Sequence, residues 1–151
     1  MKKVILFLLG VIPLVLGFLI HTWMMKNQNS VLPFKLIGII FLLFWVWVGF
    51  ITCKFERTPL KSAIIANSLA FLMLLFILFQ EIILGRYGAN MFGIVPQLYY
   101  LPLVNISSSI VGLLYSLMGW GMQVSVISLM SFLFMFGSYY LGSYFKKQKN
   151  I

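Results

Sequence analysis

Four long apolar runs, separated by short polar or charged stretches, dominate the pattern of this chain. The runs cover residues 4–25, 36–53, 62–80 and 124–145, and none of them contains Asp, Glu, Lys or Arg. Each has 18 to 22 residues, the length at which an α-helix crosses the hydrocarbon core of a bilayer, about 30 Å thick. We therefore predict four transmembrane helices, 4–25, 36–53, 62–84 and 124–145, in a single integral membrane domain covering residues 1–151.

A fifth segment is apolar but interrupted. Residues 87–123 carry no charge, and Pro96 and Pro102 predict that the stretch 89–103 lacks a continuous helix. Its second half has a helical period, which predicts a helix that lies in the outer interface or re-enters the membrane. We expect its aromatic residues to anchor it at the interface; they are Tyr87, Tyr99, Tyr100, Tyr115 and Trp120. The predicted fold class is an all-α membrane protein: a four-transmembrane-helix bundle with an additional interfacial or re-entrant helix before the last span.

Composition agrees with a membrane protein, since 62% of the residues are hydrophobic and 9% are charged, against ~25% charged in soluble domains. The net charge of +9 would suggest nucleic-acid binding in a soluble protein. Here the basic residues lie singly or in pairs at the ends of the runs, where they orient helices and meet lipid headgroups. We predict contact with the lipid bilayer and no nucleic-acid partner.

The distribution of basic residues predicts the orientation. With four spans and a cytoplasmic N-terminus, the cytoplasmic side carries Lys2, Lys3, Lys54, Arg57, Lys61, Lys146, Lys147 and Lys149, and the outside carries Lys26, Lys35 and Arg86. This is the asymmetry that cytoplasmic loops show. A competing model makes residues 101–119 a fifth span and loses the asymmetry. We predict cytoplasmic termini, and the lysine-rich composition favours a bacterial plasma membrane.

The first run begins like a secretory signal, with Met-Lys-Lys before the apolar stretch. No small-x-small cleavage motif follows it, so we expect it to remain as the first span. Pro13 cannot donate a hydrogen bond to the carbonyl of Leu9, which predicts a kink near the middle of this helix.

Three helix faces can be derived from spacing. In the third run one face carries Ala63, Asn67, Ala70, Leu74 and Glu81, and we predict that it faces the bundle interior. In the last run small residues recur every three or four positions, which predicts a helix contact within the monomer or between copies; they are Ser125, Ser128, Ser131, Ser138 and Gly142. The aromatic residues of the second run, among them Phe41, Trp45 and Trp47, are interpreted as lipid-facing bulk.

Polar side chains form the candidate site, which comprises His21, Asn67, Glu81 and Arg86. His21, Glu81 and Arg86 lie near the predicted outer surface, with Gln97 and Asn105 as neighbours, and Asn67 lies several residues inside the third run. A histidine titrates near neutral pH and a partly shielded carboxylate holds its proton more tightly, so the group could move protons or bind a cationic headgroup. The simpler alternative is a set of helix-end residues in the headgroup zone.

The inventory of reactive residues disfavours an enzyme. The chain has one histidine, two acidic residues and one cysteine, Cys53, too few for a catalytic triad or a metal site, so we predict no cofactor and no metal. Two function classes remain. One is an accessory, regulatory, assembly or immunity partner of a larger membrane system. The other is a small transporter or channel subunit that acts as an oligomer.

Overall fold

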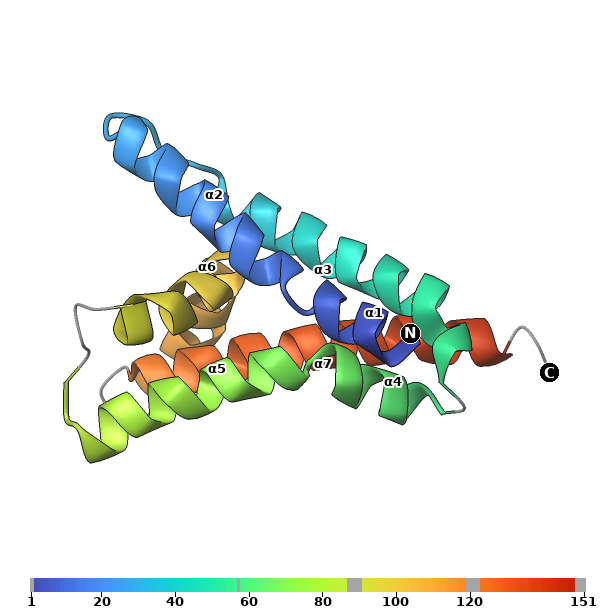
Figure 1. Cartoon of the computed structure of the whole chain (residues 1–151). Helices are drawn as coiled ribbons and strands as arrows, with labels where there is room; N and C mark the ends of the chain where they lie inside the picture. Colours follow the sequence, from blue (N-terminus) through green and yellow to red (C-terminus); the bar gives the residue numbers. More distant parts are fainter. Residues whose placement is uncertain (1, 57, 87–90, 119–122, 149–151) are drawn as a thin grey trace.

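The computed structural model describes residues 2–56, 58–86, 91–118 and 123–148, and its regular elements there are helical. In chain order they are α1 (Lys2–Leu9), α2 (Ile12–Lys26), α3 (Phe34–Thr52), a 3₁₀ turn (Cys53–Phe55), α4 (Pro59–Ala66), α5 (Ser68–Leu78), a π-helical turn (Phe79–Ile83), α6 (Met91–Met118) and α7 (Val124–Gln148) (Figure 1). The predicted all-α fold class is confirmed.

Several helical stretches are long and apolar enough to cross a membrane. They are Val4–Lys26, Phe34–Phe55, Phe92–Ser116 and Val124–Gln148, and the bent pair Pro59–Ala66 and Ser68–Ile83 is a further candidate. The first, second and last correspond to predicted spans, and the bent pair corresponds to the predicted third. The stretch in α6 was not predicted to be a span. Two hydrogen bonds, at the start of α6 and at the start of α7, place it relative to the other helices.

Both α6 and α7 begin beside the C-terminal end of α5, where the π-helical turn follows it. Gln80 donates from its Nε2 to the carbonyl of Phe92 at the start of α6, over 2.9 Å. The adjacent Glu81 accepts a hydrogen bond from the backbone N–H of Ser125 at the start of α7, over 2.7 Å. The starts of α6 and α7 therefore lie at one end of the bundle, and α6 packs against α2, α3, α5 and α7.

The opposite end of the bundle holds both termini (Figure 1). There α1 packs against α4, and the Lys147 ammonium donates to the carbonyl of Glu56 over 3.2 Å. The basic residues of this end within the described ranges are Lys2, Lys3, Lys54, Lys61, Lys146 and Lys147. At the other end, Lys26 is the last residue of α2 and Lys35 is the second residue of α3. Arg86 follows the π-helical turn. Arg57 and Lys149 lie outside the described residues. The predicted charge asymmetry thus corresponds to the two ends of the bundle.

The first span is interrupted at Gly10 and Val11, between α1 and α2. Pro13, the second residue of α2, has no N–H to donate to the carbonyl of Leu9. The backbone turns more tightly there, with Gly10 donating to Phe7 over 2.9 Å. The predicted interruption near Pro13 is confirmed.

The third span is not the single helix that was predicted, because α4 and α5 meet at Asn67 with a bend of 52°. Two side chains compete for helix carbonyls at this point. The Asn67 amide donates to the carbonyl of Ala63 over 2.9 Å, and the Ser68 hydroxyl donates to that of Ile65 over 2.8 Å. Such bonds bend helices. The predicted inner face nevertheless holds on both sides of the bend, since Ala63, Asn67, Ala70 and Leu74 are all buried.

The prediction that residues 89–103 lack a continuous helix is wrong for the residues described, because α6 runs unbroken through Pro96 and Pro102. Each proline removes the helical donor of the carbonyl four residues earlier. The carbonyl of Phe92 instead accepts the bond from Gln80. That of Leu98 faces Gly17 of α2, where an added Cβ would lie 1.8 Å from the oxygen. A neighbouring span thus supplies the donor that Pro96 removes, as membrane proteins allow, and α2 packs against the carbonyl whose donor Pro102 removes.

Two further interpretations are corrected. Tyr99 and Tyr100 are buried at the centre of the bundle rather than anchored at the interface, because their hydroxyls find carbonyl partners there. Tyr87 and Trp120 lie outside the described residues. In α3, Phe41 and Trp45 are buried whereas Trp47 is 58% exposed, so only part of the aromatic set faces lipid.

The most extensive helix packing joins α3 and α7. A Cβ on Gly49 would lie 2.2 Å from the carbonyl oxygen of Tyr139, and one on Gly142 would lie 1.9 Å from that of Val46. The two glycines therefore let the backbones touch reciprocally, in a geometry that favours weak Cα–H···O bonds. The small residues of the last span also pack against other parts of the monomer, since Ser125, Ser128, Ser131 and Gly142 are buried and Ser131 bonds to Ser107 of α6.

Candidate functional site

Polar side chains from three spans meet in the core and form what we call the central polar cluster: Trp45, Thr52, Ser62, Asn67 and Tyr139. The indole N–H of Trp45 in α3 donates to Oδ1 of Asn67 over 3.2 Å. The Tyr139 hydroxyl in α7 lies 2.6 Å from the Thr52 hydroxyl and 2.9 Å from that of Ser62. All five side chains are buried. They tie α3, α4 and α7 together at the bend of the third span.

The first half of α6 extends this network. The Tyr99 hydroxyl donates to the carbonyl of Gly10 over 2.8 Å, at the break between α1 and α2. The Tyr100 hydroxyl donates to the carbonyl of Ala70, one turn beyond the break between α4 and α5. Two adjacent tyrosines of one helix thus bind the backbones of the two interrupted spans.

The two interruptions face each other. A Cβ on Gly10 would lie 2.9 Å from the carbonyl oxygen of Ala66, the last residue of α4. Paired helix breaks are a device of transporters, in which freed backbone groups bind ions or substrates. Here side chains bond to backbone carbonyls beside the breaks: the Tyr99 hydroxyl to that of Gly10 and the Asn67 amide to that of Ala63. Among the described residues, no buried side-chain nitrogen or oxygen lacks a hydrogen-bond partner.

The predicted site residues lie at different places. Asn67 belongs to the central polar cluster, whereas Glu81, half-buried in the π-helical turn, caps the N-terminus of α7. A carboxylate there is stabilised by the helix dipole. His21 is half-buried in α2, and Arg86 is exposed after the π-helical turn. Glu81 contacts the start of α7. Its pairing with His21 or Arg86 stays a prediction.

The two suggested neighbours take no part in the central polar cluster. Gln97 is exposed on α6. Asn105 is half-buried in the same helix, and its carbonyl accepts the hydroxyls of Ser108 and Ser109. Within the described ranges, no three His, Cys, Asp or Glu side chains converge in a way that could hold a metal ion.

Sequence reasoning missed Trp45, Tyr139 and Gln80. A signal for Trp45 was present, because it shares one helix face with Gly38, Phe41 and Thr52, all buried. For Gln80, an uncharged amide near the end of an apolar run was the signal. For Tyr139 there was no such signal, because a tyrosine in an apolar run can equally well lie at the membrane surface as in the core.

The fold and its core define a polytopic, all-helical membrane protein in contact with the lipid bilayer. In comparisons with protein-family models, with curated proteins and with solved structures, nothing matches this chain.

We expect Asn67→Leu to destabilise the protein by about 1–2 kcal/mol, because it leaves the buried Trp45 indole without an acceptor. The matched control is Ser68→Ala, since the Ser68 hydroxyl bonds to the carbonyl of Ile65 in the same span and to no other span in the contacts described. Thermal unfolding in detergent, followed by tryptophan fluorescence, measures both. Equal midpoints for the two variants would contradict a stabilising role for the Trp45–Asn67 bond.

Proposed function

We propose that this protein is a membrane-embedded accessory subunit, a partner that assembles with, regulates or protects a larger membrane system. The observation that carries the proposal is the central polar cluster, whose polar groups bond to one another. A solute path needs polar groups that line water or bind the solute. Side chains committed to holding helices together favour a stable scaffold instead.

Apolar pockets on the surface support the same proposal. One is lined by Leu8, Val11, Ile12, Val15, Leu16 and Leu19, and another by Met73, Phe76, Phe92, Val95 and Pro96. A third includes Asn67 and Ser68 beside four apolar side chains. Apolar hollows on the flanks of a helix bundle suit lipid chains or partner helices rather than polar solutes.

A small transporter or channel subunit is the second candidate, and the facing helix breaks favour it. The carbonyl of Gly10 lies at the break between α1 and α2, and it would lose its Tyr99 partner if that hydroxyl moved away. Such a group could then bind a cation on a path completed by other copies of the chain.

Affinity purification after crosslinking in mild detergent separates the two candidates. A stoichiometric larger membrane protein supports the accessory subunit. A homo-oligomer without another protein supports the transporter or channel subunit. As a control, mock purification from cells with an unrelated tagged membrane protein of similar size identifies nonspecific binders.

We further propose that both termini are cytoplasmic and that the membrane is a bacterial plasma membrane. The basic residues at the terminal end of the bundle support this orientation. A reporter fused after Ile151 is expected to be active in the cytoplasm, and a cysteine at Asn27, exposed in the α2–α3 loop, should react with an impermeant thiol reagent. The native Cys53 is buried and gives little background. An external reporter would contradict the proposed orientation.

A further inference from the structure

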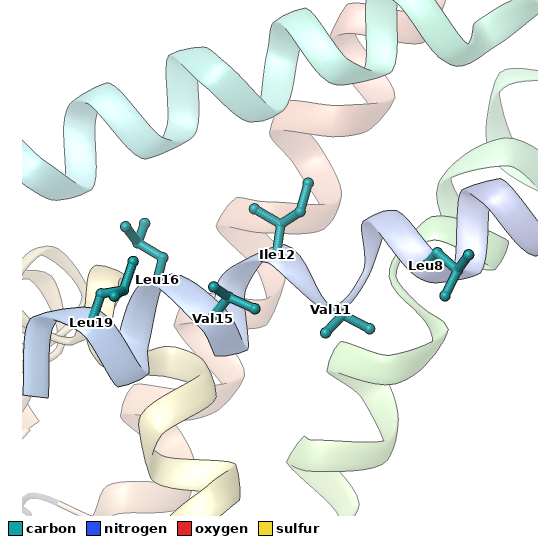
Figure 2. A pocket seen from close by; sticks show the side chains of 6 residues that line it. All are labelled: Leu8, Val11, Ile12, Val15, Leu16 and Leu19. Atoms are coloured by element: carbon teal, nitrogen blue, oxygen red, sulfur yellow. The ribbon is translucent and has the colours of Figure 1, made fainter. Parts of the chain in front are cut away.

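Two apolar grooves lie side by side along the first span. The first, about 480 Å³, follows Leu8, Val11, Ile12, Val15, Leu16 and Leu19 across the break between α1 and α2 (Figure 2). The second, about 390 Å³, lies between α2 and α3 and is lined by Ile12, Leu16, Ile37, Ile40, Phe41 and Phe44. Ile12 and Leu16 line both grooves and form the ridge between them. In Figure 2 these two side chains point toward α3.

The length of the first groove suits an extended acyl chain. From Leu8 to Leu19 a helix rises about 16 Å, roughly half of the ~30 Å hydrocarbon core. The lining side chains are aliphatic, so the groove offers neither charge nor a hydrogen bond to a polar ligand. An extended acyl chain has the right chemistry and the right length.

Polar anchors follow the first groove toward the end of α2. Trp23 and Lys26 lie four and seven residues after Leu19, on the same helix face. Trp23 is 37% exposed and Lys26 is exposed. An indole at this height sits at headgroup level, and a lysine beyond it can reach a phosphate. Lys26 therefore places a cation about 10 Å beyond Leu19, the last residue that lines the groove.

We propose that the twin grooves bind one phospholipid, with one acyl chain on each side of the Ile12–Leu16 ridge and the phosphate at Lys26. Two adjacent grooves suit the two chains of a single lipid. The positive charge at the end of α2 complements the headgroup. The binding site belongs to the leaflet at the α2–α3 end, and its existence depends on neither proposed function.

Native mass spectrometry of the protein purified with phosphatidylglycerol tests the headgroup contact. Lys26→Gln is expected to lower lipid retention about fivefold, since a lysine near a charged surface contributes ~1 kcal/mol. Lys35→Gln is the matched control. Lys35 is exposed at the same end of the bundle, but by helical position it lies on the opposite side of α3 from Phe41 and Phe44. Equal retention in both variants would overturn the proposal.

The acyl chains are tested separately, in vesicles of phosphatidylcholine and phosphatidylglycerol that contain a phospholipid with a photoreactive acyl chain. Crosslinks are expected to concentrate on residues 8–19 and 37–44. Val15→Phe, which fills the first groove, should reduce them, whereas Val4→Phe, at an exposed position that does not line it, should not. Crosslinks spread evenly over the lipid-facing helices would overturn the proposal. So would a Val15→Phe variant that keeps its lipid and loses a copurified membrane protein, because the groove would then bind a helix.

Discussion

Gly142→Ala is expected to destabilise the bundle by about 1–3 kcal/mol, the cost of overfilling a close contact. The new Cβ would lie 1.9 Å from the carbonyl oxygen of Val46, and a backbone atom of a packed helix cannot move aside as a flexible side chain does. Separation of α3 from α7 would also strain the reciprocal contact at Gly49. The midpoint of thermal unfolding in detergent, or a steric-trapping measurement in bicelles, gives the change.

The control for this variant is Gly137→Ala on the same helix. A Cβ at Gly137 would meet no atom within 4 Å, and alanine stabilises a helix interior by roughly 0.5–1 kcal/mol over glycine. The two glycine substitutions in α7 should therefore change stability in opposite directions. A stabilising Gly142→Ala would contradict the backbone contact between α3 and α7.

Gln80→Leu is expected to cost about 1–3 kcal/mol, because it leaves the carbonyl of Phe92 without a donor in an apolar environment. A second substitution should remove most of this loss of stability. Pro96→Ala restores a backbone N–H four residues after Phe92, so the loss of Gln80 should matter much less in that background. A double-mutant cycle of unfolding free energies measures the coupling.

Pro102→Ala is the control background for this cycle, because Pro102 removes the donor of Leu98, a carbonyl that Gln80 does not bind in the contacts described. Gln80→Leu should cost the same there as in the original chain. Full additivity of Gln80→Leu with Pro96→Ala would show that the amide does not replace the missing helical donor.

The spans could be derived from sequence because each depends on a local property, a run of apolar residues long enough for the bilayer. The buried stripe through Ala63, Asn67 and Ala70 followed from helical spacing for the same reason. The bend at Asn67 could not be derived. An asparagine in a membrane helix can bond across to another helix or back to its own carbonyls, and here it does both.

The course of α6 required knowledge of distant partners. Pro96 and Pro102 predict a broken helix if nothing compensates for the missing bonds. The donor to the Phe92 carbonyl lies on Gln80, in another span, and the Leu98 carbonyl packs against Gly17 of α2. Likewise, the burial of Tyr99 depends on a carbonyl at Gly10, 89 positions away. The candidate site was limited in the same way: polar residues can be found by type, but the sequence does not state which of them meet.

The contact between α6 and α7 imposes an order on biogenesis. Insertion machinery tests each segment for hydrophobicity as it emerges, and α6 has a mean hydropathy of 1.4, against 2.7 and 2.5 for the first two spans. Its hydroxyl contact at Ser107 requires Ser131 of α7, which is synthesised later. A nascent chain that ends before α7 therefore lacks part of the surface on which α6 rests, and α6 reaches its final position only after translation has passed the last span.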